Sequence, residues 1–324
     1  MLTERANAIC LLRILQDYSD AEHILPMREI ISKLRAVYDL TVDRRTVYSA
    51  VELLITLGYD ISNFEDNGKG YYLQERAFEE SEVRLLMDAV FSFPFISAKQ
   101  TNDLVKKLQT QVSIPQRRHY GHLHSIRRAR KTNNKSVFLN IELLEEAISR
   151  RVQIRFDYMQ YGLNKQLCSR RQCKYVVEPY AMVCANEHYY LICRYVGYEN
   201  FSFYRIDLMQ GIELTQMPAE PSESWRETVE KSVYAFTGKP EQIKLRCRNY
   251  IIGDILDKFG CDVKIDIDGE DYFFASFTAV PFGLEFWALQ YLPHVEVIKP
   301  QHLRDSICDK LQHNPYFDTT ETDR

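Results

Sequence analysis

The sequence predicts a multidomain α+β protein, and three observations carry this prediction. The chain has 324 residues, which is too long for one simple core and indicates two or three domains. Up to about residue 112, apolar residues recur at helical spacing. After residue 150, short segments alternate apolar and polar residues, as half-buried strands do.

Composition and charge are those of an ordinary globular protein. Apolar residues make up 45% of the chain and charged residues 27%. The formal net charge of −4 argues against nonspecific coating of nucleic acid but is compatible with a local basic surface. Charges interrupt the first 20 residues, and no apolar run is long enough to cross a bilayer. We therefore expect a cytoplasmic protein with no membrane partner.

The sequence contains no pattern typical of a metal site, a cofactor site or a catalytic centre. None of the eight cysteines forms a C-x-x-C pair. His119, His122 and His124 lie close together without a cysteine or carboxylate at useful spacing, so we interpret residues 117–135 as a basic linker. A nucleophile elbow, a P-loop and a dinucleotide fingerprint are all missing from the sequence. We therefore expect a protein that is not an enzyme and needs no cofactor.

The first 75 residues predict three helices followed by a hairpin. Pro26 is suited to the first turn of the second helix. Asp43 is placed as the N-cap of a third helix over residues 44–57, and Gly58 ends that helix. Two short strands around a turn that contains Asn67 and Gly68 then form a hairpin. This is the plan of a winged helix-turn-helix.

The start of the third helix carries side chains suited to DNA. Arg44 and Arg45 can pair with guanine or hold a phosphate. Two cations at a helix N-terminus interact unfavourably with the positive end of the helix dipole. This unfavourable placement is easier to explain if a polyanion binds next to the two arginines. The alternative is that both arginines simply face solvent at the start of the helix. Residues 1–75 hold more acids than bases, so any DNA-binding face must be narrow. The predicted DNA-binding residues are Arg44, Arg45, Thr46, Tyr48, Ser49 and Lys69.

Two segments resemble known families. Residues 4–73 resemble the winged-helix domain of the DeoR-like regulators, whose recognition helix commonly begins with the Arg-Thr-Val-Tyr pattern found here at residues 45–48. The second segment resembles the WYL domain through Val177-Glu178-Pro179-Tyr180, Tyr189-Tyr190-Leu191 and Phe203-Tyr204-Arg205-Ile206-Asp207. Tyr189 replaces the Trp of that family, and Leu208 stands where the family has a second Arg.

The resemblance to the WYL domain implies a small Sm-like or SH3-like β-barrel that senses a ligand, in some members a nucleotide or a nucleic-acid fragment. The residues here fit an anionic ligand with an aromatic part, because arginines can contact phosphates and tyrosines can stack on bases. Alternatively, the tyrosines fill the barrel core and the arginines face solvent. The predicted ligand-binding residues are Arg155, Tyr158, Arg171, Tyr180, Tyr190, Arg194 and Arg205.

The order of the segments extends the resemblance to WYL-domain transcriptional regulators over nearly the whole chain. Residues 286–300 resemble the end of the WYL C-terminal extension, which in related proteins supports dimer contacts. We expect a winged helix over residues 1–75, a helical connector and basic linker over 76–135, a WYL domain over 136–217, a linker over 218–240 and an α+β extension domain over 241–324.

These observations lead to a function hypothesis with two alternatives. The hypothesis is a homodimeric, ligand-responsive bacterial transcription regulator that binds double-stranded DNA and senses an anionic effector. The first alternative is an RNA- or single-strand-binding accessory protein in which the WYL domain is the main binding module. The second is an enzyme acting on nucleotides, for which the sequence lacks a catalytic constellation.

Overall fold

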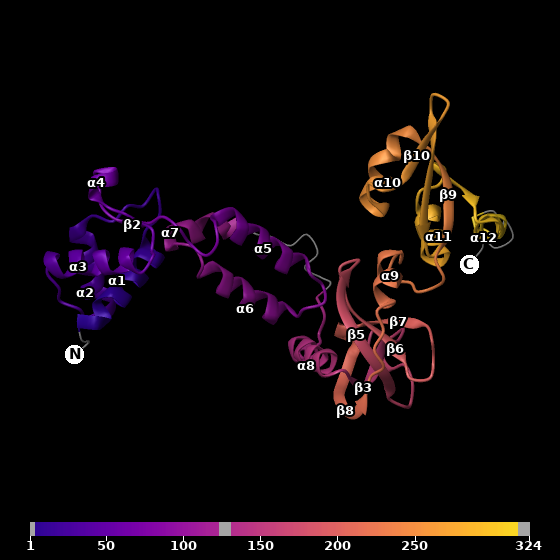
Figure 1. Cartoon of the computed structure of the whole chain (residues 1–324), viewed down its shortest axis with the longest axis horizontal. Helices are drawn as coiled ribbons and strands as arrows, with labels where there is room; N and C mark the ends of the chain where they lie inside the picture. The colour runs from indigo at the N-terminus through magenta and orange to yellow at the C-terminus, as the bar shows by residue number, and fades with distance from the viewer. Residues whose placement is uncertain (1–3, 123–130, 317–324) are drawn as a thin grey trace. The chain divides into compact units, whose positions relative to one another are not determined.

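The computed structural model describes residues 4–122 and 131–316 and has two compact units (Figure 1). The first unit runs to Lys135, and the second begins at Ser136. Each unit has its own hydrophobic cores, and the two are described separately below. Among the described residues, no helix combines the length and the apolar character needed to span a bilayer.

The first unit begins with three helices, α1 (Glu4–Tyr18), α2 (Met27–Tyr38) and α3 (Arg44–Thr56). Asp43 is the N-cap of α3, because its carboxylate accepts a hydrogen bond from the backbone N–H of Thr46 at 2.8 Å. The helices share one core, and the side chains that α3 contributes are Val47, Ala50, Val51 and Leu54. The apolar spacing of the sequence therefore places one face of α3 in the core and the other in solvent.

A small sheet follows α3, with strands β1 (Ile61–Ser62) and β2 (Tyr72–Leu73) paired antiparallel. Leu25 adds a third bridge through two backbone hydrogen bonds with Tyr71, each 2.9 Å long. The connection between the strands is not the simple polar turn that we expect from the sequence, because it contains the short helix α4 (Phe64–Asn67). A reciprocal capping box between Asn63 and Asp66 forms this helical turn.

The rest of the first unit is helical and forms a second core. Its elements are α5 (Glu80–Ser92), α6 (Ala98–Gln109), α7 (Ile114–Arg117) and η1 (Arg118–His122). Val83, Met87, Val105, Val112 and Tyr120 form the buried cluster between them. These helices therefore form a packed structure.

The interpretation of residues 117–135 as a linker is wrong for its first residues. Arg117 and His119 are held by ion pairs, with Asp17 at 3.0 Å and with Glu80 at 2.9 Å. Lys131 donates a hydrogen bond to the backbone carbonyl of Val90 at 3.1 Å, and burial lowers the pKa of Lys131 to about 8. His124 lies outside the described residues. Arg117, His119 and Lys131 are therefore held against helices α1 and α5.

The second unit begins with α8 (Val137–Arg150), which packs against a six-stranded antiparallel sheet. The strands run in the order β4-β3-β5-β6-β7, and β8 pairs with β3. Their bounds are β3 (Val152–Tyr161), β4 (Leu167–Ser169), β5 (Tyr175–Ala185), β6 (His188–Tyr195), β7 (Phe201–Arg205) and β8 (Met209–Pro218). The core beneath the sheet contains Phe156, Leu144, Ile154, Leu191 and Ile206.

The closed barrel that we expect from the sequence is not formed. Among the described residues, no ladder joins β7 to β8 or to β4, so the sheet stays open. The 3-10 helix η3 (Ile206–Leu208) carries the chain from β7 to β8, and its residues Ile206, Asp207 and Leu208 are buried. Because this helical turn replaces extended backbone at the point of closure, the hydrogen bonds that would complete a barrel are missing there.

The end of the second unit is an α+β layer that follows α9 (Trp225–Glu230). Four antiparallel strands lie in the order β10-β11-β9-β12. The elements are β9 (Glu241–Arg248), η4 (Asn249–Ile251), α10 (Ile252–Phe259), β10 (Lys264–Asp268), β11 (Tyr272–Ala279), α11 (Pro281–Gln290), β12 (Val295–Lys299) and α12 (Gln301–Gln312). This βαββαβ order is the split βαβ arrangement, which refines the α+β prediction.

Replacing Gly283 with alanine is expected to destabilise this layer by roughly 1–3 kcal/mol, because overpacked sites must shift their backbone. A Cβ atom at Gly283, in α11, would lie 2.1 Å from the backbone carbonyl oxygen of Val233. Gly253, in α10, is the matched control, since a Cβ there meets nothing within 4 Å. Hydrogen exchange of α11 and β9 should accelerate in Gly283→Ala but not in Gly253→Ala. Equal protection in both variants would show that the close approach to Val233 is not rigid.

Candidate functional site

The start of α3 presents polar side chains to solvent on one face. Arg44, Arg45, Tyr48 and Ser49 are all exposed, and the side chain of Tyr48 is 49% accessible. Neither arginine forms an ion pair with a carboxylate among the residues that the structure describes. Both guanidinium groups are therefore available to an external anion.

Asp43 anchors this helix start without neutralising it. Hydrogen bonds from the backbone N–H and the hydroxyl of Thr46, 2.8 and 2.7 Å long, lower the pKa of the Asp43 carboxyl, and the charge of Arg45 adds to the effect. The hydroxyl of Thr46 is therefore engaged in the cap. Arg45, Thr46 and Ser49 share a surface hollow of about 340 Å³ with α1 residues Asn7 and Ala8.

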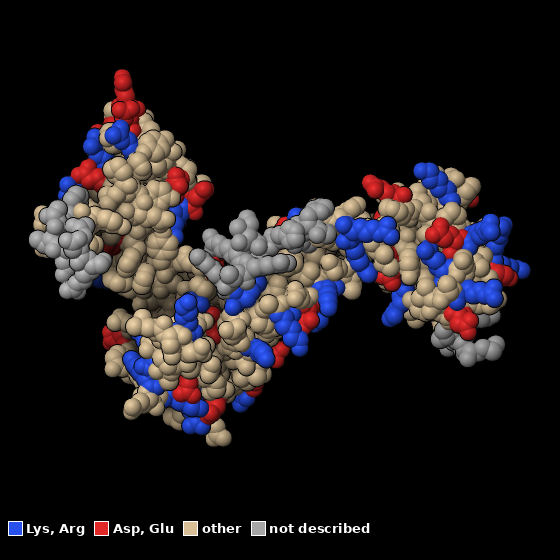
Figure 2. Space-filling view, turned by 180° about the vertical axis from the view of Figure 1, so that it is seen from behind, with Lys and Arg blue, Asp and Glu red and all other residues tan. Residues whose placement is uncertain are grey.

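Lys69 lies apart from α3 in the sequence, next to the turn that ends α4. Its backbone N–H donates to the side chain of Asn67 at 2.8 Å, and its side chain is exposed. Figure 2 shows that the visible surface of the first unit mixes Lys and Arg with Asp and Glu. The unit therefore has no broad basic face in this view, in agreement with the acidic balance of residues 1–75.

In the second unit, three of the predicted ligand residues lie together around Arg205. Its guanidinium forms two hydrogen bonds with the buried carboxylate of Asp207, 2.8 and 3.1 Å long. The Arg205 backbone N–H donates to the hydroxyl of Tyr158 at 3.2 Å. Tyr190 is directly opposite Arg205 in the β6–β7 ladder. The side chain of Arg205 stays 29% accessible, so one edge of it can meet a ligand.

Tyr158 belongs to the core of the sheet. Only 8% of it is accessible, and its ring lies edge-on to Tyr204, with the ring centres 4.9 Å apart. Burial raises the pKa of its hydroxyl despite the hydrogen bond from the Arg205 N–H. Tyr158 therefore positions Arg205, and its ring is not free to stack on a base.

Arg194 and Tyr180 form a separate group around the buried carboxylate of Glu178. Arg194 donates two hydrogen bonds to Glu178, at 2.8 and 3.0 Å, and a third to Glu220 at 2.7 Å. The hydroxyl of Tyr180 donates to Glu178 at 3.1 Å, and burial together with the neighbouring carboxylate raises the pKa of Tyr180. Tyr190 and Arg194 are four residues apart on one strand, which is about 13 Å. These groups therefore do not share a site with Arg205.

The other two predicted arginines are also placed separately. The guanidinium of Arg171 lies 4.6 Å from the ring centre of Tyr175 and 5.9 Å from that of Tyr195. Arg155 pairs with Glu213, its partner in the β3–β8 ladder, and Lys174 pairs with the same carboxylate. The seven predicted residues are thus distributed over four groups: Tyr158, Tyr190 and Arg205 lie together, Tyr180 and Arg194 share Glu178, and Arg155 and Arg171 lie apart.

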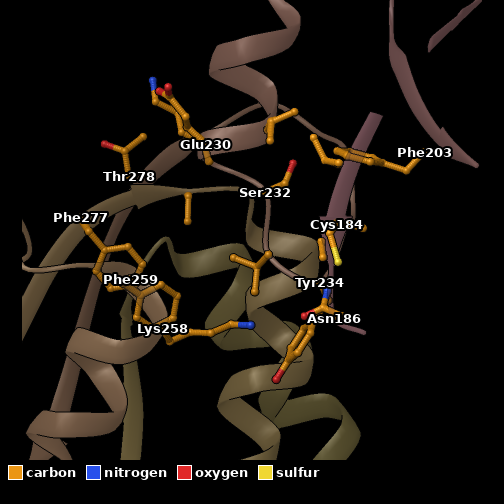
Figure 3. A pocket seen from close by; sticks show the side chains of 17 residues that line it. Cys184, Asn186, Phe203, Glu230, Ser232, Tyr234, Lys258, Phe259, Phe277 and Thr278 are labelled. Atoms are coloured by element: carbon orange, nitrogen blue, oxygen red, sulfur yellow. The ribbon is translucent and has the colours of Figure 1, made fainter. Parts of the chain in front are cut away.

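A pocket of about 240 Å³ lies beside the Arg205 group (Figure 3). The ring of Phe203, which lines it, is edge-on to Tyr190 with ring centres 6.2 Å apart. The ammonium of Lys258 lies 3.9 Å from the ring centre of Tyr234, and burial lowers the pKa of Lys258. Lys231 also lines the pocket but pairs with Glu227, whereas Lys258 forms no ion pair with a described carboxylate. Lys258 is therefore available to an anion.

The sequence reading missed the pocket because its lining comes from distant segments. Phe203 adjoins the Tyr204-Arg205 motif, which is the one sequence signal that leads to it. The remaining walls come from β5 and the turn after it, from the end of α9 and the segment after it, from α10 and from β11, and they include Tyr234, Phe259 and Phe277. Tyr234 and Ala235 both have positive φ angles, 56° and 58°, a conformation that costs energy in residues other than glycine.

A comparison with protein families identifies the domain that contains the six-stranded sheet of the second unit. Residues 140–214 match the model described as the WYL domain. The chain contains a WYL domain. This match includes all seven predicted ligand residues and the acids Glu178, Asp207 and Glu213, whereas Glu220 lies beyond its end. In the described residues, no group of three or more His, Cys, Asp or Glu side chains is placed to hold a metal ion.

Solved structures give weaker likenesses. Proteasome accessory factor B/C (PafBC) of Arthrobacter aurescens matches over 96% of this chain and 48% of its own, with 15% identity and a TM-score of 0.29. This chain thus spans about half the length of that protein. A structure titled as a CRISPR Cas-related protein matches over 74% of this chain and 73% of its own, with 11% identity and a TM-score of 0.39. The comparison with curated proteins gave no match.

Replacing Glu178 with glutamine is expected to remove an acid-sensitive part of the stability of the WYL domain. Burial raises the pKa of Glu178, but hydrogen bonds from the Glu220 N–H, Arg194 and Tyr180 outweigh this effect and lower the pKa below 4.5. A carboxyl group with a lowered folded-state pKa stabilises the fold above the unfolded pKa, and this contribution is lost as pH falls through the folded value.

Urea unfolding of the WYL domain between pH 3 and pH 8 measures this contribution. Glu178→Gln should be less stable than the parent at pH 7 by about 1–3 kcal/mol, and the difference should shrink below about pH 4.5. Glu220→Gln is the control, since Glu220 binds the same arginine but its side chain is 78% accessible. A difference that is independent of pH would contradict the assignment.

Proposed function

We propose that this chain is a ligand-responsive regulator of transcription. Residues 1–75 act as a DeoR-like winged helix that binds double-stranded DNA, and the WYL domain, taken as residues 136–217, binds an anionic effector such as a nucleotide or a nucleic-acid fragment. Residues 76–135 connect these two parts. Residues 218–240 link the WYL domain to an extension domain over residues 241–324. The protein acts as a cytoplasmic homodimer.

The observation that carries this proposal is the exposed start of α3. Arg44 and Arg45 occupy the first turn of a helix whose opposite face is buried, and neither has a carboxylate partner in the described residues. In a helix-turn-helix, the first residues of the second helix of the pair meet base edges and phosphates in the major groove. α3 has the position, the charge and the exposure for this role.

The other predicted DNA contacts are assigned according to their placement. Tyr48 and Ser49 follow the arginines on the exposed side of α3 and can contact sugar, phosphate or base. Thr46 holds the cap and supports the helix start. Lys69, in the wing formed by β1 and β2, is suited to a phosphate contact beside the groove. Because few cations take part in each subunit, a dimer that engages two half-sites is needed for useful affinity.

The effector site is assigned to the surface around Arg205 and Tyr190. Arg205 offers the accessible edge of its guanidinium to an anion, and Tyr190 offers a ring beside it. The pocket next to them adds aromatic walls and the ammonium of Lys258. An effector that binds one arrangement of the dimer more tightly than the other shifts the dimer toward that arrangement. The dimer's free energy of DNA binding then changes by the difference between the effector's binding free energies for the two arrangements.

The salt dependence of duplex binding tests the DNA part of the proposal. With the full chain and a duplex from its own promoter region, the logarithm of the binding constant should fall with the logarithm of salt concentration by about 0.9 for each neutralised phosphate. A dimer that uses both arginines of each α3 on phosphates should give a slope of about −3.6. Duplex binding that is absent at low salt would contradict the proposal.

A further inference from the structure

The four-stranded sheet of the second unit has one face covered by helices and one face on which none of α10, α11 and α12 packs. Strand side chains that point inward, such as Leu245 and Ala275, share one core cluster with Ile255 of α10, Leu284 of α11 and Leu303 of α12. All three helices therefore pack on the same side. The alternate side chains of the strands point to the other face, which we call the open face. On the two central strands these are Gln242, Lys244, Arg246, Arg248, Tyr272, Phe274, Ser276 and Thr278.

The ladder register aligns basic and aromatic side chains on this open face. Arg248 is opposite Tyr272, and Arg246 is opposite Phe274. The guanidinium groups of Arg246 and Arg248 lie 4.1 and 4.4 Å from the ring centre of Tyr272. The ammonium of Lys244 lies 4.1 Å from the ring centre of Phe274. Cations and rings thus form one continuous group across β9 and β11.

On the open face the two central strands carry cations alone, whereas the edge strand β10 carries Asp266, Asp268 and Lys264. The central strands β9 and β11 contribute three cations and no acid to this face. Asp268 on the edge strand β10 pairs with Arg246 at 2.6 Å, and Asp266 on the same strand pairs with Lys264 at 3.4 Å. Glu296 on the other edge strand, β12, pairs with Arg304 of α12 at 2.8 Å. Arg248 and Lys244 have no carboxylate partner among the described residues.

We propose that the open face binds a single-stranded nucleic acid, with bases stacked on Tyr272 and Phe274 and phosphates held by Lys244, Arg246 and Arg248. Rings on the central strands of a four-stranded sheet provide stacking platforms, and neighbouring cations neutralise the backbone. Tyr272 and Phe274 are half-buried, so a base that stacks on either ring displaces a cation that lies over it. The two rings are two residues apart on one strand, roughly 6.6 Å, which allows each to take its own base. The phosphate that Arg246 binds replaces the carboxylate of Asp268.

Single strands fit this surface better than duplexes do. Stacking on the rings requires bases whose faces are free, and the bases of a duplex are already stacked on one another. The surface is also a sheet face and not a helix that could enter a major groove. This proposal concerns residues separate from α3 and from the Arg205 group, so it does not rest on the proposed function.

Oligonucleotide binding by the full chain tests the stacking part of the proposal. The probes are fluorescein-labelled dT12, rU12 and a 12-base-pair duplex, measured by anisotropy at low salt. Tyr272→Leu combined with Phe274→Leu keeps apolar side chains but removes both rings, and it should weaken binding of the single strands at least fivefold, the effect of about 1 kcal/mol of stacking. Tyr316→Leu, at a ring that is 93% accessible, is the matched control and should change nothing.

The charge part is tested by the salt dependence of the same binding. Lys244→Gln combined with Arg248→Gln should reduce the salt slope for single strands by about 1.4, since each lost phosphate contact changes it by about 0.7. Lys239→Gln, at an exposed lysine of the same unit, is the control. Far-UV circular dichroism of each variant confirms that the sheet remains folded.

Photo-crosslinking locates the strand directly. Oligonucleotides that contain 5-iodouracil should crosslink to peptides from β9 and β11, and the relative affinities of dT12 and rU12 show whether the ligand is DNA or RNA. The proposal is overturned if single strands do not bind, if they bind more weakly than the duplex, if the two-ring variant binds them normally, or if the crosslinks map only to other parts of the chain. Arg44→Ala with Arg45→Ala should leave this binding unchanged, so failure here is distinguishable from failure of the proposed function.

Discussion

Replacing both Arg44 and Arg45 with alanine is expected to weaken duplex DNA binding at least tenfold while the helix remains folded. Each arginine that contacts a base or a phosphate contributes about 1–3 kcal/mol, and a tenfold change corresponds to about 1.4 kcal/mol. Both residues are exposed, whereas Val47 and Leu54 form the buried side of the helix. Anisotropy with a promoter duplex, at a stated salt concentration, measures the change.

The matched control is the pair Lys106→Ala and Lys107→Ala. These lysines are adjacent, exposed and in the same unit, but they lie on α6. If the general charge of the unit determined binding, both double variants would weaken it equally. The proposal requires that the α3 variant loses binding and the α6 variant keeps it, and unchanged binding by the α3 variant would exclude α3 as the DNA-reading helix.

Replacing Arg205 with alanine is expected to have the second large effect, on both stability and effector binding. The change removes two hydrogen bonds from Asp207, whose side chain is only 2% accessible. A buried carboxylate that loses charge-assisted hydrogen bonds costs roughly 1–3 kcal/mol of folding free energy. Urea unfolding of the WYL domain, followed by hydrogen exchange of β6 and β7, measures this loss.

A double-mutant cycle separates the structural role of Arg205 from its role in ligand binding. Asp207→Asn removes the charge that Arg205 neutralises, so Arg205→Ala combined with Asp207→Asn should be more stable than the sum of the single changes predicts. Arg205→Lys keeps a positive charge but loses the paired geometry. If Arg205 serves structure alone, short phosphorylated oligonucleotides will bind the folded double variant as they bind the parent. We expect weaker binding instead.

The helices of the first unit could be predicted because their local signals agree with their packing. Asp43 marked the start of α3, and the apolar spacing of Val47, Val51 and Leu54 marked its buried face. The connection between β1 and β2 was predicted less well, because the Asn67-Gly68 pair favours a two-residue turn. The capping box of Asn63 and Asp66 forms a helical turn there instead, and this signal was present in the sequence.

The ligand residues could not be grouped from the sequence, because grouping depends on strand register. The alternation of apolar and polar residues indicates that Arg155 and Arg194 lie on strands. It does not show that Glu213 and Glu178 are their cross-strand partners. The buried position of Tyr158 depends on contacts with Tyr204 and Tyr175, which are distant in the chain. For the same reason the open face was missed, although Lys244-x-Arg246-x-Arg248 already shows alternating cations.

The most direct measurement of the central claim is a nuclease protection assay across the chain's own promoter, at low salt, with and without short phosphorylated oligonucleotides. A dimer that reads DNA with two α3 helices should protect two half-sites about one helical turn apart, or a multiple of it. The oligonucleotides should also change the protein concentration needed for protection at least fivefold, the lower range of allosteric coupling. A promoter that shows no protected duplex, or protection that the Arg44→Ala and Arg45→Ala changes leave intact, would contradict the account.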